Sequence, residues 1–297
     1  MKEIAVELIK TFTEHLGEKN SVVSAVYSFK GNFLAYGSMN DTIKIISLSS
    51  GELNHSLRCK DTPDRLAFSA DEKFLASTSG LEINVWETNS YTLVKNIKSE
   101  FGSNSLVFSR DGKYLVFTCG NEIKLWSTAT WKYLKTLGGH SKYVSSTDIS
   151  PDSKLVASGS RDGTIKIWNI ISGDCIKTLE DCEKCSVNFS PDGEFLTSGS
   201  TDNTVKLWRV STGDCTATIK AHESRVQGVA FSPDGALIAS GGWDHKIKLW
   251  DVSSIQCIKT LERSGWVTSV AFSPDGRNLL AVADDQADLW KVSLLNV

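Results

Sequence analysis

The chain has 297 residues, and its 32 Lys and Arg against 35 Asp and Glu give a formal net charge of −3. Its 9 Trp, 12 Phe and 6 Tyr exclude a disordered chain, which would be poor in aromatic residues. The slightly acidic balance offers no overall attraction for phosphates, and no apolar run approaches the roughly 18–20 residues that cross a bilayer. We therefore expect a globular protein with no nucleic-acid and no membrane partner.

The first predicted strand covers residues 4–12. Acidic residues stand in the opening sequence, MKEIAVE, where a signal peptide would be apolar, so we expect an intracellular protein, cytoplasmic or nuclear. The segment Leu8–Phe12 (LIKTF) is similar to Cys257–Leu261 (CIKTL) near the other end of the chain. This similarity predicts that the two segments occupy equivalent places in one repeated architecture.

From residue 42 onwards, short segments of alternating polar and apolar residues recur, as in Thr164–Trp168 (TIKIW) and Thr204–Trp208 (TVKLW). Their final positions are residues 46, 86, 126, 168, 208, 250 and 290, at intervals of 40 or 42 residues. Six of these seven residues are Trp, and the other is Ile46. A fixed period of this length is typical of a repeat protein.

Each repeat contains the same order of strands and turns. The first strand ends in a turn such as Ser-Pro-Asp-Gly at residues 190–193, 232–235 and 273–276, in which Pro, Asp and Gly each favour a turn conformation. A second strand, a tight turn and the alternating third strand follow, and a fourth strand begins seven residues after the Trp. Four short antiparallel strands in about 40 residues predict one blade of a β-propeller.

The last repeat is incomplete, because its fourth strand would begin at residue 297, where the sequence ends. Residues 4–12 are predicted to supply that outer strand and to close the ring, which removes an exposed sheet edge. We therefore predict an all-β fold, with residues 1–297 forming a single seven-bladed propeller domain of four-stranded antiparallel blades.

These motifs make the chain resemble the WD40-repeat family over roughly residues 4–297. Trp250-Asp251 carries the dipeptide that names the family, and Gly139-His140 carries its Gly-His dipeptide. The resemblance implies buried tetrads in which a His, an Asp, a Ser and a Trp are linked by hydrogen bonds. The two complete sets are His140, Asp162, Ser158 and Trp168, and His222, Asp244, Ser240 and Trp250.

No motif of a serine hydrolase, zinc protease or phosphate loop occurs in the sequence, so we expect a protein that is not an enzyme and has no cofactor. Cys182 and Cys185 form a close pair, but zinc normally requires four ligands, so a loop thiol pair is favoured over a metal site. Cys175, Cys215 and Cys257 recur with the repeat and are predicted to be small hydrophobic packing residues.

The resemblance also implies that partners bind on the narrow top face around the central channel. This face is formed by the loops that enter the innermost strands and by the tight turns between the second and third strands. Trp, Tyr and Arg are the residue types that dominate binding hot spots. The candidate partner-binding residues at the family's positions are Met39, Tyr143, Arg161, Arg225, Gln227, Trp243 and Trp266.

We therefore predict a non-catalytic scaffold that docks a peptide or protein partner around Trp243 and Trp266, as a monomer or as a subunit of a complex. Arg161 and Arg225 would bind an acidic group of that partner. Three alternatives remain open. The two Trp could be structural, one capping the channel and the other folded onto its own loop; a small molecule or glycan could bind at the channel mouth; or the blade sides could contact a larger assembly.

Overall fold

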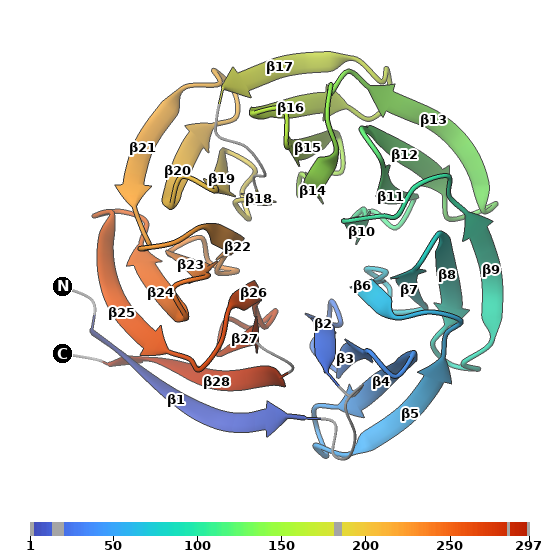
Figure 1. Ribbon diagram of the computed structural model, residues 1–297, viewed down its shortest axis with the longest axis horizontal. Helices are drawn as coiled ribbons and strands as arrows, with labels where there is room; N and C mark the ends of the chain where they lie inside the picture. Colours follow the sequence, from blue (N-terminus) through green and yellow to red (C-terminus); the bar gives the residue numbers. More distant parts are fainter. Residues whose placement is uncertain (1–2, 14–20, 181–185, 284–285, 296–297) are drawn as a thin grey trace.

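The computed structural model describes residues 3–13, 21–180, 186–283 and 286–295. In these residues, seven antiparallel sheets of four strands surround a central channel as the blades of a propeller (Figure 1), and no helix occurs. Consequently, the described part of the chain contains no helix long and apolar enough to span a membrane. The predicted all-β propeller is confirmed.

The blades are numbered along the chain, and the strands of each blade are given in order from the channel outwards. Blade 1 contains β2 (Val22–Tyr27), β3 (Phe33–Ser38), β4 (Thr42–Ser47) and β5 (Leu53–Arg58). Blade 2 contains β6 (Pro63–Phe68), β7 (Phe74–Ser79), β8 (Glu82–Glu87) and β9 (Leu93–Lys98). Blade 3 contains β10 (Leu106–Phe108), β11 (Tyr114–Cys119), β12 (Glu122–Ser127) and β13 (Lys132–Gly138).

The second half of the ring repeats this order. Blade 4 contains β14 (Val144–Ile149), β15 (Leu155–Ser160), β16 (Thr164–Asn169) and β17 (Cys175–Glu180). Blade 5 contains β18 (Ser186–Phe189), β19 (Phe195–Gly199), β20 (Thr204–Arg209) and β21 (Cys215–Lys220). Blade 6 contains β22 (Val226–Phe231), β23 (Leu237–Gly242), β24 (Lys246–Asp251) and β25 (Gln256–Glu262). Blade 7 contains β26 (Val267–Phe272), β27 (Asn278–Ala283), β28 (Gln286–Leu295) and β1 (Glu3–Phe12).

Blade 7 is completed by the first strand of the chain, as predicted. Strand β1 lies beside β28 (Figure 1) and pairs antiparallel with it. In their register, Leu8 lies opposite Trp290. The side chains of Ile4 and Phe12 are buried, the first against blade 6 and the second against blade 1. The N-terminal strand therefore closes the last sheet and packs on both neighbouring blades.

The hydrophobic core lies between the blades. The described residues form seven buried clusters, and each cluster contains side chains from two adjacent blades. Small residues in the second strands allow this close packing, since a Cβ on Gly241 would lie only 2.4 Å from Cγ1 of Val267 in the next blade. The stability of each blade therefore depends on its two neighbours, as in other repeat proteins.

The outer strands correct one prediction. Cys175, Cys215 and Cys257 are exposed, so the prediction that they are packing residues was wrong. β17 and β25 each have one buried side chain, Leu179 and Leu261 respectively. Their other side chains are exposed or only partly buried. A repeated position in these strands therefore does not imply burial.

Candidate functional site

The predicted top-face positions come together in pairs at one mouth of the channel. A main-chain hydrogen bond joins the loop before the innermost strand to the tight turn of the same blade, from Trp243 N to Arg225 O at 3.0 Å. The same bond runs from Arg161 N to Tyr143 O at 2.9 Å in blade 4. These bonds fix the spacing between the two kinds of loop from which the candidate side chains extend.

Two buried hydrogen-bonded networks hold these turns. In blade 4, the imidazole of His140 lies 2.8 Å from both the Asp162 carboxylate and the Ser158 hydroxyl. The indole N–H of Trp168 donates to the same hydroxyl at 2.8 Å. Because Asp162 directly follows Arg161 in the turn, this network positions an exposed arginine from a buried anchor.

The second network has the same geometry in blade 6. His222 lies 2.8 Å from Asp244 and 2.7 Å from Ser240, and the indole N–H of Trp250 donates to Ser240 at 2.9 Å. Asp244 directly follows Trp243, so this network holds the turn that carries a candidate contact residue. Both histidines are therefore buried beneath the top-face turns, where they hydrogen bond to the turn Asp and to a second-strand Ser.

Burial lowers the pKa of both histidines below the ordinary value, although the neighbouring carboxylates act in the opposite direction. Burial of Asp162 would raise its pKa, but hydrogen bonds from Thr164, His140 and Ser141 outweigh that effect and lower the pKa to about 2. Each network therefore favours a neutral imidazole beside an ionised carboxylate, which suits a structural anchor.

Arg225, Trp243 and Trp266 form one stack, here called the tryptophan stack. The indole rings of Trp243 and Trp266 are parallel, with an interplanar angle of 8° and 4.5 Å between their centroids. The Arg225 guanidinium lies 3.6 Å from the Trp243 ring centroid. Two planar groups at these distances cannot share one ring face, so Arg225 and Trp266 enclose Trp243 from opposite sides.

The tryptophan stack remains partly open to a partner. Trp266 is 49% exposed, while Trp243 is half-buried. The buried Nε1 of Trp243 has no hydrogen-bond acceptor among the described residues. The Trp266 ring packs on Trp243 of the neighbouring blade.

A second aromatic cluster lies on blades 3 and 4 and is called the tyrosine cluster. Tyr143 is 48% exposed and meets Phe101 edge to face at 6.5 Å, while the Arg161 guanidinium lies 5.9 Å from the tyrosine ring centroid. Phe101 was missed in the sequence because it stands one residue outside the family's positions. The sequence feature that could have identified it is an aromatic residue in the polar loop between β9 and β10.

The other predicted residues lie apart from these clusters. Met39 is exposed on the blade 1 turn, and Gln227 lines the channel below the tryptophan stack. Cys182 and Cys185 lie outside the described residues. Among the described residues, no group of three or more His, Cys, Asp or Glu could hold a metal ion.

Acidic residues occupy another part of the top face, on blades 1 and 2. Asp41, Asp61, Asp64 and Glu82 line a shallow depression there together with Lys60. The Lys60 ammonium lies 3.9 Å from Glu82, which leaves an excess of negative charge in the depression. The top face is therefore acidic on blades 1 and 2 and carries arginines on blades 4 and 6.

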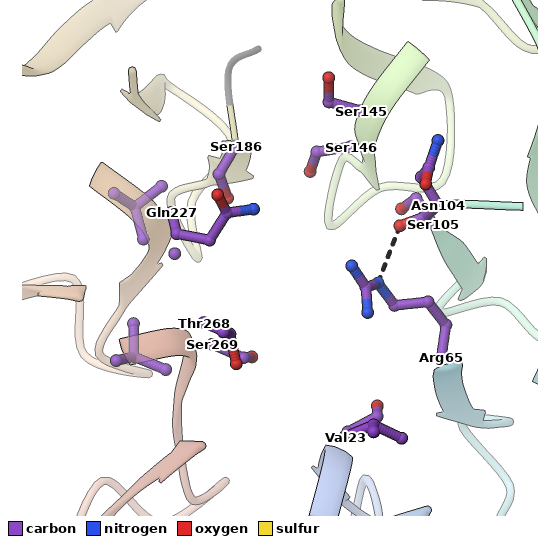
Figure 2. Close-up of a pocket in the computed structure, with 14 residues that line it drawn as sticks. Val23, Arg65, Asn104, Ser105, Ser145, Ser146, Ser186, Gln227, Thr268 and Ser269 are labelled. Atoms are coloured by element: carbon purple, nitrogen blue, oxygen red, sulfur yellow. Dashed lines mark hydrogen bonds between the residues drawn. The ribbon is translucent and has the colours of Figure 1, made fainter. Parts of the chain in front are cut away.

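The channel beneath the top face contains a polar cavity of about 160 Å³. Figure 2 shows the guanidinium of Arg65 extending from β6 into this space, facing hydroxyl and amide side chains of other blades. Arg65 is the single charged residue among the described residues that line the cavity. No motif or repeat position in the sequence pointed to Arg65.

Comparison with known proteins places this architecture in a family. The profile described as "WD domain, G-beta repeat" (WD40) matches residues 6–47, 131–169, 173–209, 213–251 and 255–291, more than half of the chain. The chain belongs to the WD40 family. The matches leave out residues 48–130, where two WD40 repeats carry Gly80 and Gly120 in place of the turn Asp.

Individual WD40 relatives match only short stretches. Eukaryotic translation initiation factor 3 subunit I of Aspergillus niger is 41% identical over 44 residues, which are 15% of this chain and 13% of the relative. The small ribosomal subunit protein RACK1z of Arabidopsis thaliana is 43% identical over 49 residues, 16% of this chain and 15% of the relative. The chain thus matches less than a fifth of the length of these relatives.

Proposed function

We propose that this WD40 propeller is a non-catalytic scaffold that docks a peptide or protein partner on its top face. The tryptophan stack provides the main contact, and the tyrosine cluster provides a second one across the channel mouth. We further propose that this binding takes place inside the cell and that the chain acts as a subunit of a larger assembly.

The exposure and chemistry of the tryptophan stack carry this proposal. Exposed large aromatic side chains that gather on one face of a protein usually mark an interaction site. Trp and Arg are enriched in hot spots because they bury a large rigid area and also hydrogen bond. Arg225, Trp243 and Trp266 offer both properties within one stack that already holds the aromatic rings in place.

The distribution of charge suggests how a partner would lie. An acidic group of the partner would meet Arg161 or Arg225, whose guanidinium groups can form two parallel hydrogen bonds to a carboxylate. A basic group would meet the acidic depression around Asp61 on blade 2. We therefore expect an extended segment with an apolar or aromatic anchor, an acidic group near blades 4 to 6 and a basic group near blades 1 and 2.

The relatives support the assembly part of the proposal through their names, which describe a subunit of an initiation factor and a protein of the small ribosomal subunit. A protein partner is favoured over RNA for this chain because of its net charge of −3 and the acidic part of its top face. Phosphate contacts would make binding weaken steeply as salt is raised. Docking on the aromatic stack would be far less sensitive to salt.

The proposal is tested by selecting extended peptides from a displayed library against the native chain and measuring the affinity of a selected peptide by calorimetry. The double variant Trp243→Ala/Trp266→Ala should weaken binding by more than about 100-fold, because each central hot-spot residue contributes roughly 2 kcal/mol. Thermal melting should show a folded ring with a modest loss of stability, since stacking of one aromatic pair contributes about 1 kcal/mol.

A matched control is the double variant Leu53→Ala/Leu93→Ala. Both leucines are about as exposed as Trp266 but lie on the outer strands β5 and β9, so this variant should bind the peptide like the native chain. If the tryptophan variant melts normally and still binds within threefold of the native affinity, docking at the tryptophan stack is wrong.

A further inference from the structure

A ring of hydroxyl groups surrounds the channel below the top face. Five blades carry serine at the same repeat position, on the innermost strand or, in blade 3, directly before it. Glycine holds this position in blade 6, and Arg65 holds it in blade 2. A Cβ on Gly228 would lie 3.1 Å from the Cα of Ser269 in blade 7, which is tighter than an ordinary contact, so the close approach of the two blades favours glycine there. The five serines are Ser24, Ser105, Ser146, Ser186 and Ser269.

A β-bulge at the start of the innermost strands adds more polar groups to the same space. The register of β14 against β15 shifts between Val144 and Ser146, so Ser145 is left out of the pairing, and β26 skips Thr268 in the same way. Ser145 and Ser146 therefore both line the cavity instead of pointing to opposite faces of the sheet. The buried hydroxyl of Ser145 has no hydrogen-bond partner among the described residues.

Arg65 brings a positive charge to the channel, and no acidic side chain among the described residues contacts it directly. Its Nε donates to the main-chain oxygen of Asn104 at 2.8 Å, and its Nη1 donates to the main-chain oxygen of Asp64 at 2.7 Å. Both acceptors are neutral carbonyls. No described residue accepts a hydrogen bond from Nη2 or forms an ion pair with the guanidinium, and the carboxylate of Asp64 does not line the cavity.

The hydroxyl groups of the ring differ in what they offer to the cavity. The Ser146 hydroxyl oxygen accepts a hydrogen bond from Val187 N at 3.3 Å, which leaves its proton available to the cavity. The Ser105 hydroxyl accepts a hydrogen bond from Thr147 N at 2.9 Å and donates one to Thr147 O at 3.3 Å. The amide of Gln227 reaches the same space from the other side of the channel (Figure 2). One fixed cation surrounded by neutral donors is an arrangement that favours an anion.

We propose that this cavity binds a small oxyanion of the size of inorganic phosphate, between Nη2 of Arg65 and the hydroxyl ring. A cation is disfavoured because none of the described residues that line the cavity carries a carboxylate, and Arg65 would repel it. A sugar is disfavoured because the lining residues that the structure describes include no aromatic side chain. A nucleotide does not fit, since the cavity of about 160 Å³ is smaller than the roughly 300–1,000 Å³ of sites for larger ligands.

The test is titration of the full chain with inorganic phosphate in a chloride buffer of constant ionic strength, followed by calorimetry and by thermal melting. Native protein should show one saturable site and a melting temperature that rises with phosphate concentration, as expected for a ligand of the folded state. Arg65→Met should weaken binding at least tenfold, and Asp64→Asn should tighten it about twofold because it removes a nearby negative charge.

Two further variants keep the result interpretable. Ser269→Ala removes one hydroxyl of the ring and should weaken binding several-fold, which still tests the site if Arg65→Met does not fold. Arg225→Met removes an arginine of the top face and should leave phosphate binding unchanged. Absence of saturable binding to the native chain, or equal binding by the native chain, Arg65→Met and Ser269→Ala, would overturn the proposal.

This site goes beyond the proposed docking function, and the two can fail separately. Trp243→Ala/Trp266→Ala should lose the selected peptide and keep phosphate, whereas Arg65→Met should lose phosphate and keep the peptide. If Arg65 matters only when an acidic or phosphorylated peptide is docked, the channel holds a group of the partner and a site for the free anion is wrong.

Discussion

His140 and His222 show how a single buried side chain links the interior of a blade to its surface. Each imidazole hydrogen bonds to an Asp of a top-face turn and to a Ser of the second strand. Burial lowers both pKa values, so the folded chain resists protonation of these side chains while the unfolded chain accepts protons near pH 6.5. Stability should therefore be lost as the pH falls below about 6.5.

This expectation is measured as the free energy of unfolding in urea at pH 7.5 and 5.5. The native chain should lose stability on acidification by up to about 1.4 kcal/mol per pH unit for each histidine. Asp148 acts in the opposite direction, because burial raises its pKa to about 6 and the folded chain then takes up a proton that the unfolded chain does not. A comparison with variants is therefore needed.

The variant His140→Asn/His222→Asn isolates the contribution of the two networks. It should start from a lower stability at pH 7.5 and lose less on acidification than the native chain. His245→Asn changes a histidine in a tight turn of blade 6 and serves as the control. Equal pH dependence in the native chain and the double variant would contradict the assignment of neutral, buried histidines.

Among individual residues, those that anchor the local turns could be predicted from the sequence. The residues of the two networks recur at fixed spacing because each turn requires the same anchor. The contact between Trp243 and Trp266 could not be predicted, because it depends on side-chain conformations in two different blades. The exposure of Cys175 was also missed, since a period in the sequence does not reveal which face of an outer strand is buried.

Strand β1 is the element that joins the two ends of the chain. Thr11 donates a hydrogen bond to the buried carboxylate of Asp288 in β28 at 2.7 Å, and Arg263 approaches the same carboxylate within 2.5 Å. Phe12 packs in the core between blades 7 and 1. Closure by β1 therefore combines main-chain pairing, the hydrogen bond from Thr11 to a buried carboxylate, and hydrophobic packing.

The importance of this strand is tested by Phe12→Ala, which should lower the free energy of unfolding by about 3–5 kcal/mol as a large core side chain is removed. Ile9→Ala is the matched control, because Ile9 is on the same strand and 52% exposed. Its effect should stay within about 1 kcal/mol. Urea unfolding of both variants measures the difference, and equal stabilities would mean that β1 does not hold the ring closed.

For the innermost strands, the sequence predicts their number and order but not their β-bulges. Their number and order follow from the repeated turns, so the seven strands around the channel could be predicted. The bulge beside Arg65 could not be predicted, because the alternation of residues in a sequence indicates an ordinary strand. In such a strand, Asp64 and Arg65 would point to opposite faces. The polar cavity follows from these bulges and from the meeting of several blades, which no single repeat encodes.

The whole molecule is a ring whose core lies in seven interfaces between blades, within the described residues. This arrangement follows from the sequence period, because four strands in 40 or 42 residues bury one sheet face against the next. The ring brings the tryptophan stack and the tyrosine cluster to one face, separated by blade 5 on one side and by blades 1 and 2 on the other.

Binding of the partner to the top face can be observed by hydrogen–deuterium exchange of the full chain with and without a saturating selected peptide. We expect protection in the top-face segments around residues 141–145, 161–163, 223–227, 243–245 and 263–268, with the outer strands unchanged. Protection confined to the outer strands, such as β5, β9 and β13, would contradict it and assign docking to the blade sides.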